Sequence, residues 1–82
     1  MVEVIVTETF RRAVDKIKHA EIKERVKKQI QKIIESPDAG KPLRYDFKGA
    51  RSLRVPPFRI IYALHEGRLY LLNFEHRKTA YD

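Results

Sequence analysis

The spacing of apolar residues changes from helical to extended close to Pro42, and this change constrains the fold more than any other feature. Before it, apolar side chains recur at helical spacing in two stripes, at positions 10, 13, 14 and 17 and at positions 22, 26, 30, 33 and 34. After it, short runs alternate as strands do, with Phe58, Ile60 and Tyr62 as the clearest example. Because the helical and extended halves are separate in sequence, they predict an α+β fold.

Turn and cap residues set the expected boundaries. Residues 1–6 are rich in β-branched side chains and predict a first strand, and Thr7 is expected to cap a helix that runs to about His19. A second helix is expected from Ala20 until Ser36-Pro37 stops it, followed by a loop over residues 38–42. Further extended segments are expected at 43–48, 52–55, 58–64 and 69–74, with a tight hairpin at Glu66-Gly67 and a polar tail over 76–82.

The predicted order is therefore βααβββ in a single domain spanning residues 1–82. We expect an antiparallel sheet covered on one face by an N-terminal helical hairpin, which leaves the other face free for a site. Tyr62 is expected in the core.

Charge and composition narrow the classes of function. The chain of 82 residues has a formal net charge of +7, divided as +2 over residues 1–40 and +5 over residues 41–82. A basic second half attracts polyanions. The absence of cysteine excludes a disulfide scaffold and thiol catalysis, and three scattered histidines argue against a metal site. No apolar run is long enough to span a membrane and no signal peptide is evident, so we expect a cytoplasmic protein without cofactor.

Arginines on the predicted strands are the main candidates for a site. Antiparallel pairing would bring Arg51, Arg54 and Arg59 to neighbouring positions of one sheet, and Arg77 follows the next strand. Guanidinium groups bind phosphate through two parallel hydrogen bonds, so the pattern indicates an anion site. The alternative is that Arg59 pairs with Asp46 or Glu75 and is structural. Lys41, Arg44 and Lys48 extend the positive field or form a solvated face.

Two sequence motifs contain these arginines, and a third segment links the predicted helices to the sheet. Residues 49–62 read GARSLRVPPFRIIY, residues 76–81 read HRKTAY, and Ser36-Pro37 and residues 40–43 (GKPL) join the helices to the sheet. Together they resemble the RelE/ParE toxin superfamily over essentially the whole chain. The resemblance implies a helical hairpin against an antiparallel sheet, as expected from the residues alone. Pro56-Pro57 stands where the family usually has Gly-Asp, which excludes a primed two-residue turn, and Ser52 stands where RelE-type nucleases often have a basic residue.

The resemblance also implies an activity. It predicts a type II toxin that enters the ribosomal A site and cleaves mRNA, by attack of a 2′-hydroxyl on its own 3′-phosphate. Arg59, Arg77 and Tyr81 would be catalytic: Arg59 would stabilise the phosphorane, Arg77 would hold the phosphate or assist the leaving oxygen, and Tyr81 would act as a base or a stacking platform. The RNA-binding residues implied by this resemblance are Arg51, Arg54, Lys48 and His76.

Two other functions fit the same residues. One is a ParE-like toxin that inhibits DNA gyrase by binding, without nuclease chemistry. The other is a catalytically silent co-repressor that only binds an antitoxin. The expected partners are an acidic, partly disordered antitoxin, the ribosome with its mRNA, and operator DNA reached through the antitoxin; no membrane partner is expected.

Overall fold

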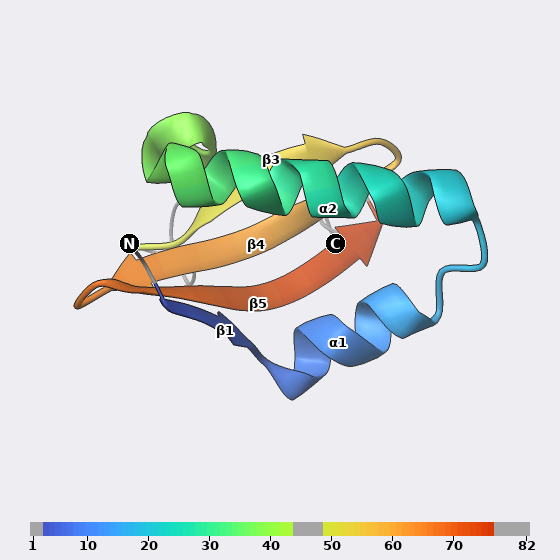
Figure 1. The fold of residues 1–82 in the computed structure, drawn as a ribbon, viewed down its shortest axis with the longest axis horizontal. Coiled ribbons are helices and arrows are strands. Elements are labelled where there is room, and N and C mark those ends of the chain that lie inside the picture. Colours follow the sequence, from blue (N-terminus) through green and yellow to red (C-terminus); the bar gives the residue numbers. More distant parts are fainter. Residues whose placement is uncertain (1–2, 44–48, 77–82) are drawn as a thin grey trace.

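The computed structural model describes residues 3–43 and 49–76 of the chain. Within these ranges the elements follow one another as β1 (Glu3–Val6), α1 (Glu8–Asp15), α2 (Ala20–Glu35), a 3₁₀ turn η1 (Pro37–Ala39), β2 (Lys41–Pro42), β3 (Arg51–Val55), β4 (Phe58–His65) and β5 (Arg68–His76). Figure 1 shows α2 lying across the sheet and running back in the opposite sense to α1. The predicted α+β class is confirmed, with one strand before the two helices; in the described residues four strands follow the helices, where the predicted order βααβββ has three.

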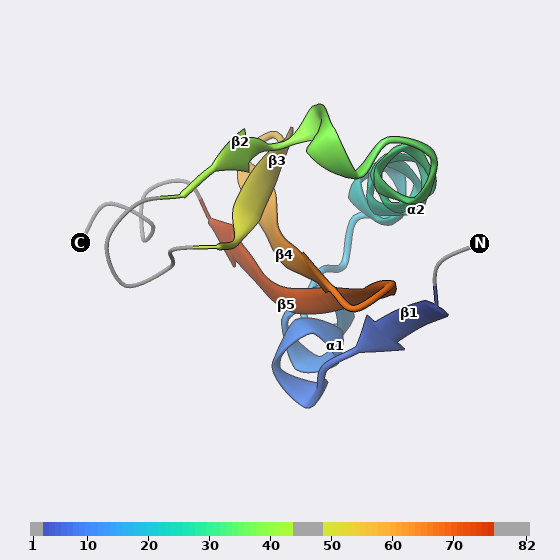
Figure 2. The same ribbon diagram turned by 90° about the vertical axis from the view of Figure 1, so that its left-hand side faces the viewer.

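The five strands form one mixed sheet in the order β1-β5-β4-β3-β2. The pairs β2–β3, β3–β4 and β4–β5 are antiparallel, as expected, whereas β1 lies parallel to β5. A parallel pair needs a long crossover between its strands, and both helices and the β2–β4 region lie between β1 and β5 in sequence. Figure 2 shows how the twist of the sheet separates β2 at one edge from β1 at the other.

Two boundaries differ from the sequence prediction. The first helix ends at Asp15 and not near His19. The backbone N–H of Lys16 still bonds to the carbonyl of Arg12, four residues back, but the N–H of Ile17 bonds to the carbonyl of Val14, only three residues back, which tightens the last turn and ends the α-helix. The segment expected as a loop over 38–42 contains the short strand β2, which pairs with β3 through Lys41 and Pro42. Of the strand expected over 43–48, residues 44–48 lie outside the described residues.

The predicted cap and hairpin are present. Thr7 Oγ1 accepts a hydrogen bond from the backbone N–H of Phe10 at 3.2 Å and donates one to the carbonyl of Leu71 at 2.7 Å, so the cap of α1 also fixes this helix to β5. Glu66 and Gly67 join β4 to β5 with φ values of 51° and 76°. Two successive residues with positive φ are what a type I′ hairpin requires.

A single hydrophobic core lies between the helices and one face of the sheet. Both helix stripes contribute, with Phe10 from α1 and Val26 and Ile33 from α2. The sheet contributes alternate residues of its central strands: Val55, Ile60, Tyr62, Leu69, Leu71 and Phe74. Tyr62 is fully buried, which confirms its predicted core position. No helix in the described part of the chain combines the length and apolar character needed to cross a membrane.

Candidate functional site

The β3–β4 hairpin places two arginines directly opposite each other. Val55 and Phe58 close the hairpin around Pro56 and Pro57, and the next pair in the register is Arg54 with Arg59. The two prolines keep a two-residue connection with a cis peptide bond between them, the arrangement found in type VI turns rather than in primed turns. Directly opposed residues of an antiparallel pair point to the same face, so both side chains lie on the face away from the helices.

Arg59 is held against β5 by one carboxylate. Its Nη2 lies 3.9 Å from Oε1 of Glu75, its register partner on β5, and the two side chains are only 22% and 19% exposed. Among the described residues, Arg59 Nε is the one buried side-chain polar atom without a hydrogen-bond partner. The pairing with Glu75 is one of the two structural alternatives raised by the sequence, while Asp46 lies outside the described residues.

The other predicted site residues on β3 differ in their setting. Arg54 is exposed, and its backbone carbonyl accepts a hydrogen bond from Gln29 Nε2 of α2 at 2.9 Å. Arg51 pairs in register with buried Tyr62 and therefore lies on the helix side of the sheet, away from Arg54. Its Nη1 donates to the carbonyl of Gly40 at 2.9 Å, so Arg51 braces the link between α2 and β2.

His76 is also on the helix side of the sheet. It pairs in register with Phe58, and the two rings meet edge to face with centroids 5.2 Å apart. Both line a shallow hollow of about 470 Å³ at the start of α2, together with His19, Glu21, Ile22, Arg25, Pro56 and Pro57. The structure thus brings Arg54 and Arg59 together but places Arg51 and His76 on the opposite face. Lys48, Arg77 and Tyr81 lie outside the described residues.

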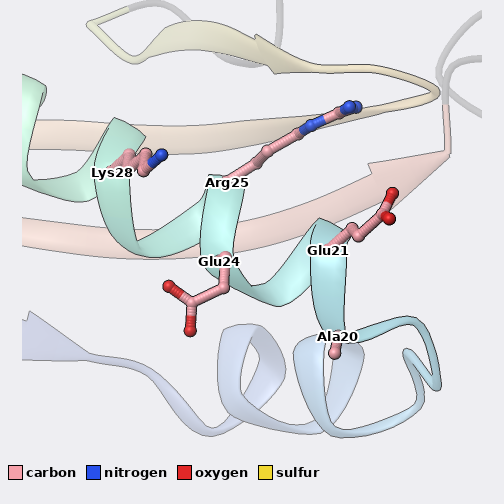
Figure 3. A pocket seen from close by; sticks show the side chains of 5 residues that line it. All are labelled: Ala20, Glu21, Glu24, Arg25 and Lys28. Atoms are coloured by element: carbon pink, nitrogen blue, oxygen red, sulfur yellow. The ribbon is translucent and has the colours of Figure 1, made fainter.

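A second hollow, of about 340 Å³, lies on the outer surface of α2. Figure 3 shows the five side chains that line it, with Glu24 turned toward α1 and Arg25 extended toward the strands. Its charges are mixed, with Glu21 and Glu24 beside Arg25 and Lys28, so it offers no concentrated field to a charged ligand. Within residues 3–43 and 49–76, no cluster of three or more histidine, aspartate or glutamate side chains could hold a metal ion.

Glu75 is a site residue that the sequence did not single out. The sequence indicated Glu75 only as one of two alternative ion-pair partners of Arg59. The alternation of β5 could have identified it, because Asn73 and Glu75 flank the core residue Phe74 and so face away from the helices. The sequence did not show which residue of β4 stands opposite Glu75, since that depends on the register of the hairpin.

The fold of this chain is shared with solved structures of small toxins from toxin–antitoxin systems. The toxin–antitoxin complex RelBE2 from Mycobacterium tuberculosis contains a chain with 26% identity and a TM-score of 0.78, covering 93% of this chain and 98% of that one. A YoeB/ParE toxin from Agrobacterium tumefaciens shares the fold at 20% identity and a TM-score of 0.80, covering 92% and 98%. The RelB–RelE complex from Methanococcus jannaschii contains a chain with the same fold at 19% identity and a TM-score of 0.76, and the match covers 95% of each chain.

A comparison of the sequence with family models assigns the chain to one family within this fold class. A family model described as the ParE toxin of the type II toxin–antitoxin system parDE matches residues 4–81, so the chain belongs to this family of the RelE/ParE superfamily. No curated protein sequence matches this chain.

Proposed function

We propose that this toxin is a ribosome-dependent endoribonuclease that cleaves mRNA in the A site and so inhibits translation. The observation that carries the proposal is the Arg54–Arg59 pair, two guanidinium groups at directly opposed positions on the face away from the helices. The half-buried side chain of Arg59 has little freedom, so its charge is organised before any substrate arrives. The similarity at 26% identity to a chain of the RelBE2 complex also supports the RelE branch, for which the resemblance of the sequence implies a nuclease.

The reaction needs three aids that basic side chains and a tyrosine can supply. The 2′-hydroxyl must lose a proton, the phosphorane must be stabilised, and the 5′-oxygen must gain a proton. Arg59 stabilises the phosphorane in this proposal, and exposed Arg54 orients the RNA backbone. By resemblance to the superfamily, Arg77 assists at the phosphate or leaving oxygen. Tyr81 serves as base or stacking platform, and a base role requires neighbouring cations to lower its pKa from about 10.

An acidic antitoxin is the proposed partner. Two of the three similar structures named above are toxin–antitoxin complexes, and a chain with a net charge of +7 attracts a segment of opposite charge. A partly disordered acidic region would gain order on binding and cover the arginine-bearing face. In this proposal, operator DNA is reached through the antitoxin.

A translation assay tests the nuclease. Purified toxin is added to a cell-free translation reaction, and the mRNA ends are mapped by primer extension with and without ribosomes. We expect cuts within codons only when ribosomes are translating the message. Inhibited translation with intact mRNA would contradict the proposal.

Inhibition of DNA gyrase is the second candidate, favoured by the description of the matching family as ParE. Arg59 and Arg77 fit both branches of the superfamily, so these residues do not distinguish them. A supercoiling assay with the same preparation does: gyrase inhibition with uncut mRNA would support this candidate. A protein that binds its antitoxin but is inactive in both assays would be the silent co-repressor.

A further inference from the structure

The arginine face of the hairpin carries one acidic side chain that the proposed reaction does not use. Glu75 is the register partner of Arg59 on β5, and its Oε1 lies 3.9 Å from Arg59 Nη2. A carboxylate repels a phosphate, so substrate binding alone would disfavour one at this position. Its presence therefore calls for a role in the free protein.

The carboxylate of Glu75 can compensate the repulsion between the two opposed arginines. Arg54 and Arg59 occupy directly opposite positions, where like charges destabilise a strand pair. Arg59 is also removed from most of its water, which makes an uncompensated charge unfavourable. Among the residues that the structure describes, Glu75 supplies the one carboxylate within 4.0 Å of either guanidinium.

The ion pair leaves much of the guanidinium unused. A separation of 3.9 Å is too long for a hydrogen bond, so the contact is electrostatic only. Arg59 Nε is buried with no acceptor among the described residues. A guanidinium has five N–H donors in a fixed fork that matches two phosphate oxygens. A phosphate can therefore provide the hydrogen bonds that Glu75 does not.

We propose that Glu75 is an internal counter-anion, which compensates Arg59 in the free toxin and is displaced from it by a phosphate group of bound RNA. Glu75 is then a positioning residue: it keeps the guanidinium ordered and lowers the affinity for phosphate, acting only through Arg59. The inference rests on the proposed function for the identity of the ligand as RNA.

Binding of a short RNA tests the affinity part of this inference. A fluorescein-labelled single-stranded RNA of six nucleotides is titrated with the full chain at fixed salt without ribosomes, and anisotropy gives Kd. We expect Glu75→Gln to bind about tenfold more tightly, because a like charge next to the phosphate is removed. The matched control is Glu66→Gln, which changes net charge equally at the other end of the β4–β5 hairpin, in an exposed turn. For this control we expect Kd to change by about twofold or less, since salt screens the interaction between distant charges.

A double-mutant cycle tests the dependence on Arg59. In an Arg59→Ala background, Glu75→Gln should no longer increase the affinity, because the group through which Glu75 acts is gone. A similar gain with and without Arg59, or a gain no larger than that of Glu66→Gln, would overturn the proposal. The proposal would also be overturned if Glu75→Gln bound a hexaglutamate peptide more tightly but not RNA, because the ligand of this site would then be a carboxylate.

The wild-type protein provides a measurement that does not depend on the folding of any variant. The NMR signal of the Arg59 Nε–H should shift when the RNA hexamer is added, because the guanidinium that carries it then exchanges Glu75 for a phosphate. An unchanged signal at saturating RNA would contradict displacement of Glu75. None of these measurements requires cleavage, so failure of the nuclease proposal in translation assays would be distinguishable from failure of this one.

Discussion

Arg59 is the residue on which the proposed reaction depends most. A preorganised donor aimed at the developing charge acts mainly in the transition state, and losing one typically costs ~10²–10³ in rate, or roughly 3–4 kcal/mol. We expect Arg59→Ala to abolish growth inhibition and mRNA cleavage while the protein still folds and binds antitoxin. Arg59→Lys should rescue poorly, because an ammonium does not reproduce the planar fork. Single-turnover cleavage on stalled ribosomes measures both effects.

The control for Arg59 is Lys41→Ala, which removes the same charge from exposed β2. It should leave cleavage largely intact at moderate salt. Because Arg59 contacts Glu75, its loss should also lower the melting temperature modestly. If activity and stability fell together in proportion, Arg59 would be structural. A folded Arg59→Ala protein cutting at full rate would exclude the catalytic assignment.

Tyr62 is the residue that joins the core to the α2–β2 link. Its hydroxyl donates to the carbonyl of Pro37 at 2.7 Å and accepts from the backbone N–H of Gly40 at 2.9 Å. Tyr62→Phe would leave both backbone groups without this partner, which we expect to lower the free energy of unfolding by about 1–3 kcal/mol. Urea denaturation measures the change, with Tyr70→Phe on β5 as the comparison. Equal stability of wild type and Tyr62→Phe would show that the bridge contributes nothing.

At the scale of elements, the first turn of α1 is held by a cluster of ion pairs. Glu8 Oε1 lies 2.6 Å from Arg11 Nη2 and 3.0 Å from Arg12 Nε. Hydrogen bonds from Arg11 and then Arg12 lower the pKa of Glu8 below its ordinary value of 4.5. A carboxyl group whose pKa is lowered in the folded state contributes stability above its unfolded pKa, and this contribution is lost as pH falls through the folded pKa.

We therefore expect Glu8→Gln to lower the melting temperature at pH 7 and to match wild type well below pH 4.5, where wild-type Glu8 is protonated as well. The helix dipole adds to the effect, because Glu8 lies in the first turn. Thermal unfolding monitored by circular dichroism across pH tests this, with Glu24→Gln in α2 as the charge-matched control. A deficit of the same size at acid and neutral pH would contradict the ion-pair explanation.

At the scale of the whole molecule, a net charge of +7 predicts how the antitoxin binds. An acidic segment should associate rapidly and with strong salt dependence, because the attraction acts over a distance and is screened by ions. We expect an antitoxin peptide with its Asp and Glu changed to Asn and Gln to bind more weakly and with a shallower salt dependence. Isothermal titration at several salt concentrations measures both, and comparable affinity for the two peptides would contradict the prediction.

Local sequence patterns determined the elements of this protein. The N-cap at Thr7, the stop at Ser36-Pro37 and the turn at Glu66-Gly67 each depend on residues within a few positions of one another, and all three occur as predicted. The α+β class and the core position of Tyr62 follow from the same periodicity. Such features can be predicted because cap, turn and period are properties of contiguous residues.

Only the tertiary structure decided which distant residues meet. The parallel pairing of β1 with β5, the positions of Arg51 and His76 on the helix side, and the contact of Arg59 with Glu75 all depend on strand order and register. Register has a period of two, so a shift by one residue moves a side chain to the other face of the sheet. The sequence therefore supplied the arginines of the candidate site, and the packing of the whole chain selected Arg54, Arg59 and Glu75 as neighbours.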